Sequence, residues 1–460
     1  MASLGGMCAK EGYHLDKRAV KAWIMYDWAN SAYATTVLAA VLPVFYASVA
    51  AATLDTDTAA SYLAYTHSIG MLCVALLTPL LGTLADLSGR KGDFLRVFSI
   101  IGIVATLGFS TIGEGDWLLA SALLVISTIG FAGGNTFYDA MLPDLVSADR
   151  RDMVSSKGYA YGYIGGGLLL AVNMLMIQQP GWFGMGSTLA GTRLAFISVA
   201  LWWLLFSIPL FRHSPRRPAA PDMPKSWKAY AGVGIRRLRQ TFSQIRRFPQ
   251  LVRMLVAFWF FNDGINTIIL MATIYGTSIG IGTADLMLAL LLTQFIGFPC
   301  TLLLGAWAQR WGAKQVLMVS LSIYICIVIL GYFMTSAIHF YLLAGLVGVV
   351  QGVSQSTARS LFSNLMPAGR TGEYFGFVNI TGKFSSIFGP FVFGWVGQLT
   401  GSTRWGILSL IFFFAAGIAV LVTVKVQQGM SDAIQADQEE GQGWMHHPIS
   451  GKGSEARSTG

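Results

Sequence analysis

Long apolar runs separated by short polar connections occupy most of the chain. A helix needs about 20 mostly apolar residues to cross the hydrocarbon core of a bilayer. This pattern predicts an all-α polytopic membrane protein with twelve transmembrane helices. The twelve stretches of sufficient length are 20–49, 62–87, 94–112, 117–142, 158–177, 193–211, 251–278, 286–307, 316–335, 340–366, 374–399 and 405–424.

The twelve stretches divide into two groups of six, and the second group repeats features of the first. The segments 27–30 (DWAN), 82–91 (GTLADLSGRK) and 141–143 (MLP) are answered in the same order by 263–266 (DGIN), 305–314 (GAWAQRWGAK) and 365–367 (LMP). Duplicated halves are common in transporter folds. We therefore expect two pseudo-symmetric six-helix bundles, 20–211 and 251–424, around a central cavity.

Composition supports a membrane protein and argues against other classes. Charged residues are 12% of the 460 and hydrophobic residues 54%, with mean hydropathy +0.58. A chain this apolar would expose too much apolar surface to water, so a soluble enzyme is nearly excluded. The four cysteines, Cys8, Cys73, Cys300 and Cys326, are far apart and show neither disulfide nor metal spacing. The net charge of +9 comes from basic residues in the loops between the apolar stretches. We relate these residues to membrane orientation and expect no nucleic acid partner.

The positions of the basic residues predict the orientation. If the N-terminus is cytoplasmic, nearly all of the 31 Lys and Arg residues fall on the cytoplasmic side, the exceptions being Arg193 and Arg404. The N-terminal segment 1–19 and the tail 425–460 are then both cytoplasmic. Short loops, and a polar N-terminal segment without a cleavable signal, suit a bacterial inner membrane.

The linker 212–250 and the tail 425–460 are the two long polar segments. In the linker, Ile235, Leu238, Phe242, Ile245 and Phe248 recur at helical spacing with arginines between them. This predicts an amphipathic helix on the cytoplasmic membrane surface; a charge cluster that only sets topology is the alternative. The tail is polar and acidic, and we expect it to be disordered.

Polar residues inside the spans are the candidates for chemistry. A charged side chain in hydrocarbon costs at least ~2.5–3.5 kcal/mol, so it should face a cavity or a partner. We expect first and fourth helices of each bundle to bring polar stripes together along an aqueous pathway. The predicted substrate or ion pathway consists of Asp27, Asn30, Asn135, Tyr138, Asn262, Asp263, Asn266, Gln351, Gln355, Arg359 and Lys383.

Alternatives remain for the charged members of this set. Asp27 and Asp263 can exchange protons if buried, or they can pair with Arg359 or Lys383 and lock a gate. Asp139 lies near the cytoplasmic end of its span, which favours a gate. Lys383 can face the cavity or extend its amine to the interface.

The connection 82–91 is the strongest local motif. Two glycines, Gly82 and Gly89, bracket Asp86, and the basic pair Arg90 and Lys91 follows. An acidic group at such a turn can face a helix N-terminus or a basic residue. We expect these residues, with Asp139, to form a cytoplasmic gate.

Enzyme and cofactor motifs are almost absent from the sequence. It contains neither a phosphate-binding G-x-x-x-x-G-K-[ST] loop nor an H-E-x-x-H metal motif. We therefore expect no ATP hydrolysis, no metal and no cofactor.

Several of these segments resemble a known family. The 82–91 loop resembles the signature of the major facilitator superfamily, departing at Leu87, where a basic residue is usual. The segment 26–33 (YDWANSAY), with 162–167, 262–264, 355–362 and 388–390, resembles the unknown-major-facilitator family of bacterial permeases, which is related to the fungal autophagy-linked vacuole effluxer. The resemblance runs from about 21 to 424. It implies alternating access between two six-helix bundles, and the fungal relatives imply amino-acid export.

The sequence thus predicts a secondary transporter, not an enzyme, that moves a small polar solute such as an amino acid, with proton coupling as a hypothesis. Its expected partners are that solute, protons and the lipid bilayer, and no oligomer is required. Two alternatives stay open: a membrane sensor or partner protein acting through the linker or tail, and a lipid-handling protein on the same scaffold.

Overall fold

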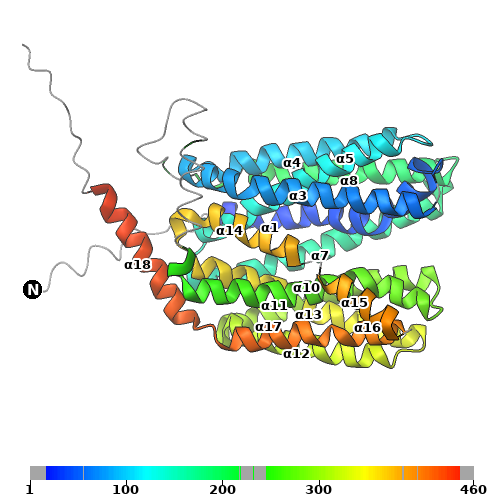
Figure 1. Ribbon diagram of the computed structural model, residues 1–460. Helices are drawn as coiled ribbons and strands as arrows, with labels where there is room; N and C mark the ends of the chain where they lie inside the picture. The colour runs from blue at the N-terminus through cyan, green and yellow to red at the C-terminus, as the bar shows by residue number, and fades with distance from the viewer. Residues whose placement is uncertain are drawn as a thin grey trace, which may run out of the picture.

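The computed structural model describes residues 17–54, 56–216, 218, 232, 245–385, 388–400 and 402–445. In this part of the chain the regular structure is helical, and the long helices run roughly parallel in two bundles (Figure 1). The twelve-helix architecture predicted from the apolar runs is confirmed. The predicted linker helix lies mostly outside the described residues; its last part forms the short turn η5 (Ile245–Arg247).

The first bundle contains the six predicted spans of the first half, and several spans are built from more than one element. The first span is continuous through α1, η1, α2 and η2, with π-helical turns in its second half. The bounds are α1 (Lys17–Ala32), η1 (Tyr33–Val41), α2 (Leu42–Phe45), η2 (Tyr46–Ala50), α3 (Thr56–Ser88), α4 (Lys91–Gly108), η3 (Phe109–Thr111), α5 (Trp117–Ala140), α6 (Leu142–Leu145), α7 (Ala148–Gln178), η4 (Pro180–Phe183) and α8 (Thr188–His213).

The second bundle repeats this order, and a terminal helix follows it. The eleventh span is described as α14 and α15, on either side of residues 386–387, which lie outside the described residues. The bounds are α10 (Pro249–Ser278), α11 (Thr283–Trp311), α12 (Ala313–Tyr332), α13 (Ala337–Leu365), η6 (Ala368–Arg370), α14 (Thr371–Ser385), α15 (Phe388–Thr400), α16 (Thr403–Ser409), α17 (Ile411–Val422) and α18 (Val426–Met445).

Ten helices of the described chain are long and apolar enough to cross a membrane by length and composition. The two remaining predicted spans correspond to α10 and to α14 followed by α15. The helix α10 runs over 30 residues and carries Asn262, Asp263 and Asn266 in its middle. The helices α14 and α15 have 15 and 13 described residues and lie on either side of the undescribed residues 386–387.

Two glycine turns show the internal repeat in the backbone. Gly89, between α3 and α4, has φ +63°, and Gly312, between α11 and α12, has φ +93°. They occupy equivalent places in the repeated segments 82–91 and 305–314. A side chain at these φ values is strained, so both turns require glycine. The repeat seen in the sequence therefore corresponds to a shared local geometry.

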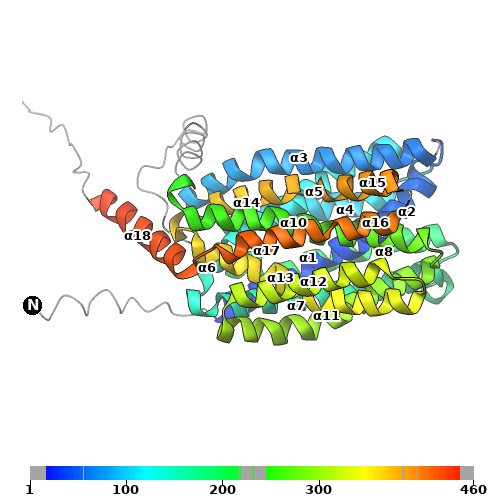
Figure 2. The ribbon, with the colours of Figure 1, turned by 60° about the horizontal axis from the view of Figure 1, so that its bottom comes forward.

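The bundles meet through a few helix pairs. Helix α3 of the first bundle packs against α14 of the second. Helix α7 of the first bundle packs against α11 and α13 of the second. Figures 1 and 2 show these helices along the junction, with α18 projecting from one end. This end carries Gly89, η6 and the start of α7, and we call it the loop end. We call the other end of the bundles the opposite end.

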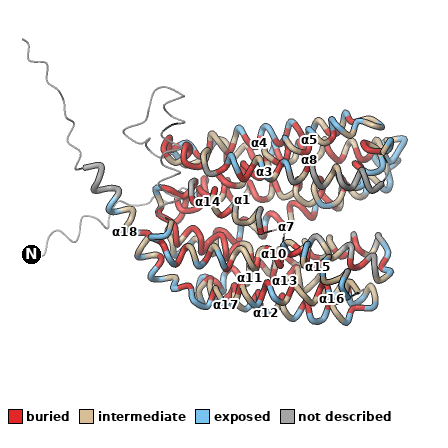
Figure 3. Tube along the Cα trace, viewed as in Figure 1, coloured by how far each residue is buried: buried red, intermediate tan, exposed pale blue. Residues whose placement is uncertain are grey.

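Burial follows the pattern expected in lipid. Buried residues concentrate inside each bundle and along the junction (Figure 3). Large apolar side chains on the outer faces are exposed, including Leu118 (68%), Leu342 (63%) and Phe412 (63%). Apolar surface of this extent is incompatible with water and suits hydrocarbon. The chain is an integral membrane protein.

The tail differs from the sequence-based expectation of disorder. Its first part forms α18, which packs against α13 and α10 at the loop end. Ala433 is buried on the inner face of α18, and Asp437 accepts hydrogen bonds from the backbone N–H groups of Ala368 and Gly369 at 2.8 and 3.2 Å. The prediction was wrong here because a few apolar residues suffice when a ready surface lies next to the helix.

Candidate functional site: a buried charge cluster and an apolar cavity

A buried arginine joins the two bundles in the half of the junction nearer the loop end. Arg359, on α13, is 5% exposed and donates to the carboxylates of Asp27 on α1 at 3.4 Å and Asp139 on α5 at 3.0 Å. It also donates to the hydroxyl and backbone oxygens of Ser155 on α7, both at 2.9 Å. We call Asp27, Asp139 and Arg359 the charge cluster. One guanidinium thus binds three helices of the other bundle.

Aromatic rings complete the environment of this guanidinium. The guanidinium carbon lies 4.2 Å from the ring centroid of Tyr159, 4.8 Å from that of Trp23 and 5.3 Å from that of Tyr138. The Tyr138 hydroxyl donates to Asp27 at 2.7 Å, and the Trp23 indole donates to the backbone oxygen of Tyr138 at 2.9 Å. Cation–π contacts of this kind strengthen when water is excluded.

A glycine makes the close packing around Asp27 possible. A Cβ on Gly158 of α7 would lie 2.6 Å from the Asp27 carboxylate and 3.0 Å from the Tyr138 hydroxyl. Real Cβ atoms do not approach oxygen so closely, so α7 can pack here only with glycine.

Asn30 and Asn135 form a second contact between α1 and α5. The Asn30 amide nitrogen donates to the Asn135 amide oxygen at 2.6 Å. Both residues lie one turn from charge-cluster residues, Asn30 from Asp27 and Asn135 from Asp139. The polar stripes predicted on the first and fourth helices therefore face one another.

Asp263 has a different environment from Asp27, although the two residues are equivalent in the repeat. It is fully buried on α10 and accepts the backbone N–H of Gly389, at the start of α15, at 2.9 Å. Its second carboxylate oxygen has no hydrogen-bond partner in the described part of the structure. Nearby, the Asn262 amide donates to the Ser385 hydroxyl at 2.9 Å.

The remaining predicted pathway residues lie on the same helices. Asn266 is one turn beyond Asn262 on α10, and Gln355 is one turn before Arg359 on α13; both are half-buried. Lys383 belongs to α14, but its side chain lies outside the described residues. The choice between a cavity-facing and an interface-directed lysine therefore stays a prediction.

The loop end holds a second buried ionic group. The Lys91 ammonium lies 3.2 Å from the carboxylate of Asp86 and 2.9 Å from that of Asp144. It also donates to the hydroxyl of Thr371, on α14, at 2.6 Å. The Thr371 hydroxyl in turn donates to the backbone oxygen of Ala140 at 2.9 Å. Lys91 thus connects three elements of the first bundle to the start of α14.

The other residues of the predicted gate fall into two groups. A Cβ on Gly372 would lie 2.8 Å from the backbone oxygen of Gly82 and 3.0 Å from the Asp86 carboxylate, so α14 begins directly against the 82–91 turn. Arg90 instead has a largely exposed side chain and pairs with Asp93 at 2.6 Å. The structure therefore places Arg90 outside this contact.

Further contacts at the loop end join α7 to α13. The Arg151 guanidinium donates to the backbone oxygen of Ser363 at 2.6 Å and to the side chain of Asn364 at 3.0 Å. The Ser360 hydroxyl bonds the carboxylate of Asp152, and the Ser155 hydroxyl donates to the Ser356 backbone oxygen at 2.9 Å. With Lys91 and Arg359, these bonds hold the bundles together from the loop end to the charge cluster.

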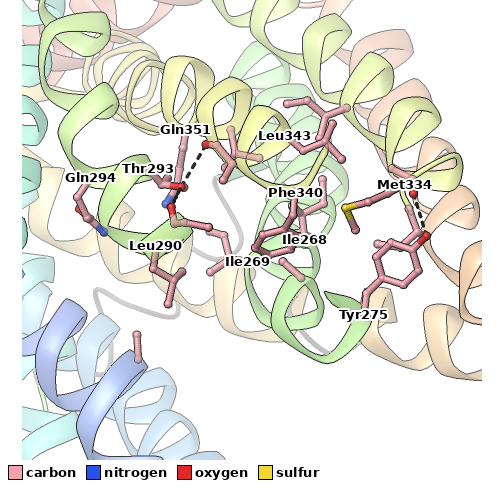
Figure 4. Close-up of a pocket in the computed structure, with 18 of the residues that line it drawn as sticks. Ile268, Ile269, Tyr275, Leu290, Thr293, Gln294, Met334, Phe340, Leu343 and Gln351 are labelled. Atoms are coloured by element: carbon pink, nitrogen blue, oxygen red, sulfur yellow. Dashed lines mark hydrogen bonds between the residues drawn. The ribbon is translucent and has the colours of Figure 1, made fainter. Parts of the chain in front are cut away.

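A partly open cavity of about 290 Å³ lies between the charge cluster and the opposite end. Its lining comes mainly from α10, α11, α12 and α13, with small residues of η1 on the side of the first bundle (Figure 4). The lining is chiefly aliphatic and aromatic; its polar members are Thr35, Tyr275, Thr293, Gln294 and Gln351. Of the predicted pathway residues, Gln351 is the one that contributes to this lining.

Sequence reasoning missed several residues of these contacts. Ser155 and Thr371 lie in polar segments just before the predicted fifth and eleventh spans, so they were counted as loop residues. Trp23 precedes Asp27 by one helical turn, and that spacing was a usable signal. Thr293 and Gln294 lie inside an apolar span whose facing direction the sequence alone does not fix.

Known proteins resemble the chain over most of its length. The family model described as vacuole effluxer Atg22 like matches residues 53–434. The MFS-type transporter YxiO of Bacillus subtilis is 38% identical, covering 87% of this chain and 94% of YxiO. Autophagy-related protein 22 of Saccharomyces cerevisiae is 23% identical, covering 82% of this chain and 80% of that protein.

Solved structures show the same fold. The human organic anion transporter MFSD10 superposes with a TM-score of 0.67 at 16% identity, covering 88% of this chain and 99% of MFSD10. The proton:xylose symporter XylE gives a TM-score of 0.67 at 15% identity, with 88% and 94% covered. Identities this low show the fold alone. Together with the family match, they show that the chain is a secondary transporter of the major facilitator superfamily and belongs to the Atg22-like vacuole effluxer family.

Proposed function

We propose that this transporter moves a small polar solute by alternating access and couples the movement to protons through the charge cluster. The observation that carries the proposal is that Arg359 of one bundle is bonded to both Asp27 and Asp139 of the other. A change of protonation in this cluster alters the attraction between the bundles directly.

Charge balance supports proton coupling. Two carboxylates face one guanidinium, so the cluster carries a net negative charge when both are ionised. Removing charge from water is expensive, and an unbalanced buried charge favours binding of a proton. A proton on Asp27 or Asp139 neutralises the cluster and weakens one of the two ion pairs. The bundles then separate more easily at this level.

The contacts at the loop end support a state closed on that side. Four side chains form hydrogen bonds across the junction between the charge cluster and the loop end: Lys91, Arg151, Ser155 and Arg359. Opening that end requires these bonds to break together. We propose that the loop end faces the cytoplasm, as the distribution of Lys and Arg indicates, in the plasma membrane of a bacterium.

Amino acids are the first solutes to test, because the resemblance to the fungal vacuole effluxers implies amino-acid export. The experiment uses the full chain in proteoliposomes, with labelled amino acids and an imposed pH gradient. We expect the pH gradient to drive accumulation of at least one of them. Asp27→Asn and Asp139→Asn should keep exchange of solute across the membrane but lose gradient-driven accumulation.

Glu114→Gln is the control, because this exposed residue lies at the opposite end, away from the junction, and should behave as the parent protein. Asp263→Asn tests whether the second buried carboxylate takes part. Accumulation that ignores the pH gradient in the parent protein and in all these variants would remove proton coupling. Absence of any solute flux would remove the proposed transport of amino acids.

A further inference from the structure

The cavity differs in character from the polar pathway expected for a polar solute. No charged side chain is among the described residues that line it, and most of them are aliphatic or aromatic. We propose that the cavity binds an uncharged amphipathic solute, with an apolar body against Ile268, Phe340 and Leu343 and a hydrogen-bonding head against Gln294 and Gln351. This inference rests on the proposed alternating-access transport but departs from its amino-acid candidate, because an amino acid carries two charges and this cavity offers no charged side chain among its described lining residues.

The polar groups of the lining are not equally available to a ligand. The Thr293 hydroxyl donates to backbone oxygens of Ala289 and Ala344 at 3.0 and 3.1 Å, and the Tyr275 hydroxyl donates to that of Gly331 at 2.8 Å. The amides of Gln294 and Gln351 make no hydrogen bond to another described residue. A primary amide both donates and accepts, so these two residues can bind a neutral polar head.

The free amides and the aromatic residues lie on different sides of the cavity. Figure 4 shows Gln294, Thr293 and Gln351 together on one side and Phe340, Met334 and Tyr275 on the other. Gln351 precedes Arg359 by two helical turns, roughly 12 Å along α13. The polar side of the cavity therefore faces the middle of the junction, and the apolar side faces the opposite end.

Electrostatics argues against a charged head. An ion in an apolar cavity needs an opposite charge or several hydrogen bonds. The guanidinium of Arg359 already binds Asp27, Asp139 and Ser155, so it is occupied by the protein itself. A sugar is also disfavoured, because two amides cannot replace the water bonded to its many hydroxyls. The volume of about 290 Å³ is at the small end of ligand pockets.

A series of straight-chain primary amides, from butanamide to decanamide, tests this inference on the purified full-length protein. Binding is measured by isothermal titration and by the shift in melting temperature. We expect affinity to rise about fourfold for each added CH₂ and then to fall once the chain exceeds the cavity. Nonspecific partition of the amides into detergent micelles would instead increase steadily with chain length, without such a maximum. The matched carboxylates, such as hexanoate, and xylose should bind at least tenfold more weakly.

Two neighbouring leucines on α13 provide a matched pair of variants. Leu343 lines the cavity, whereas Leu342 is 63% exposed on the outer face. Leu343→Trp should abolish amide binding, and Leu342→Trp should leave it unchanged. Ala344→Leu is a milder filling of the same cavity in case the tryptophan prevents folding. Gln351→Leu should weaken binding about three- to tenfold through the lost hydrogen bond.

The outcomes separate this inference from the proposed function. Equal or tighter binding of hexanoate or xylose, or amide binding unaffected by both Leu343→Trp and Ala344→Leu, would overturn the inference and leave transport intact. Amide binding that shows the expected maximum, without any solute flux in proteoliposomes, would uphold the cavity assignment and remove the transport proposal.

Discussion

The guanidinium of Arg359 lies 3.4 Å from the carboxylate of Asp27, although 332 positions separate the two residues in the sequence. The contact joins the fourth helix of the second bundle to the first helix of the first bundle. Asp139, the third member of the cluster, is 3.0 Å from the same guanidinium. A transporter that rocks its bundles must change or break these bonds in each cycle, so their strength bears on both stability and coupling.

Replacing Arg359 by glutamine should destabilise the protein strongly. The substitution leaves the buried carboxylate of Asp27 and the partly buried carboxylate of Asp139 without a cation, and breaking a buried ion pair by removing one partner costs about 3–5 kcal/mol. We expect a clear fall in the melting temperature of the purified protein. The double variant Asp27→Asn/Arg359→Gln should recover part of the loss, because it also removes one of the unpaired charges. A double variant as unstable as the single one would show that charge balance is not the cause.

The close approach of α7 to α1 gives a second prediction. Gly158→Ala places a methyl group 2.6 Å from the Asp27 carboxylate, so either the helices separate or the carboxylate moves away from Tyr138. Overpacking of this kind costs about 1–3 kcal/mol. We expect a lower melting temperature and impaired proton-driven flux. Gly181→Ala is the control, because no atom lies within 4 Å of its added Cβ, and it should match the parent protein in both measurements.

Much of the fold could be predicted from the sequence because the membrane imposes a local rule. Every span must be about 20 apolar residues long, and this length can be read without knowledge of tertiary contacts. The rule does not mark where a helix extends beyond its apolar stretch. The helix α7 begins at Ala148, ten residues before its predicted span, because residues such as Ser155 find partners on α13.

Pairing of the polar residues could be predicted only in part. The free-energy cost of placing a charge in lipid identified Asp27, Asp139 and Arg359 as residues that need partners. Which carboxylate pairs with which cation depends on the rotation of the helices and the distance between the bundles. Gln351 and Gln355 lie on one stripe of α13, yet only Gln351 lines the described cavity. The apolar lining has no periodic signal strong enough to be recognised from the sequence. In α18, by contrast, Val426, Met430 and Ala433 recur at helical spacing, and that spacing was a usable signal for its packing.

Thr371 offers a way to weaken the loop end without changing any charge. Thr371→Val keeps the shape of the side chain but removes the hydroxyl that accepts from Lys91 and donates to Ala140. A hydrogen bond to a charged group contributes about 1.5–3 kcal/mol, so opening of the loop end should become on the order of tenfold more frequent.

Cysteine labelling can measure this opening. Ser356, buried at the junction, is replaced by cysteine after the four native cysteines are changed to alanine, and its reaction rate with a maleimide is followed. Thr400→Val is the control, since the Thr400 hydroxyl bonds mainly within its own exposed helix end. Equal labelling rates in the Thr371→Val variant and its parent would show that Thr371 does not hold the loop end closed.

The contact between Asp437 and η6 gives the last prediction. The Asp437 carboxylate accepts from the backbone N–H groups of Ala368 and Gly369, and η6 leads directly into Thr371, so α18 supports the segment that carries the loop-end contact. Asp437→Ala removes the carboxylate that accepts from these N–H groups. The expected loss of folding free energy is comparable to that of removing a helix N-cap, about 1 kcal/mol.

We expect Asp437→Ala to lower the melting temperature and to speed labelling at position 356 in the same direction as Thr371→Val. Asp432→Ala is the matched control, because Asp432 lies on the same helix and makes no hydrogen bond to another described residue. If the labelling rate rises equally in both aspartate variants, the effect belongs to the charge of α18 rather than to its bond with η6. If it rises in neither, α18 packs on the second bundle without influencing the junction.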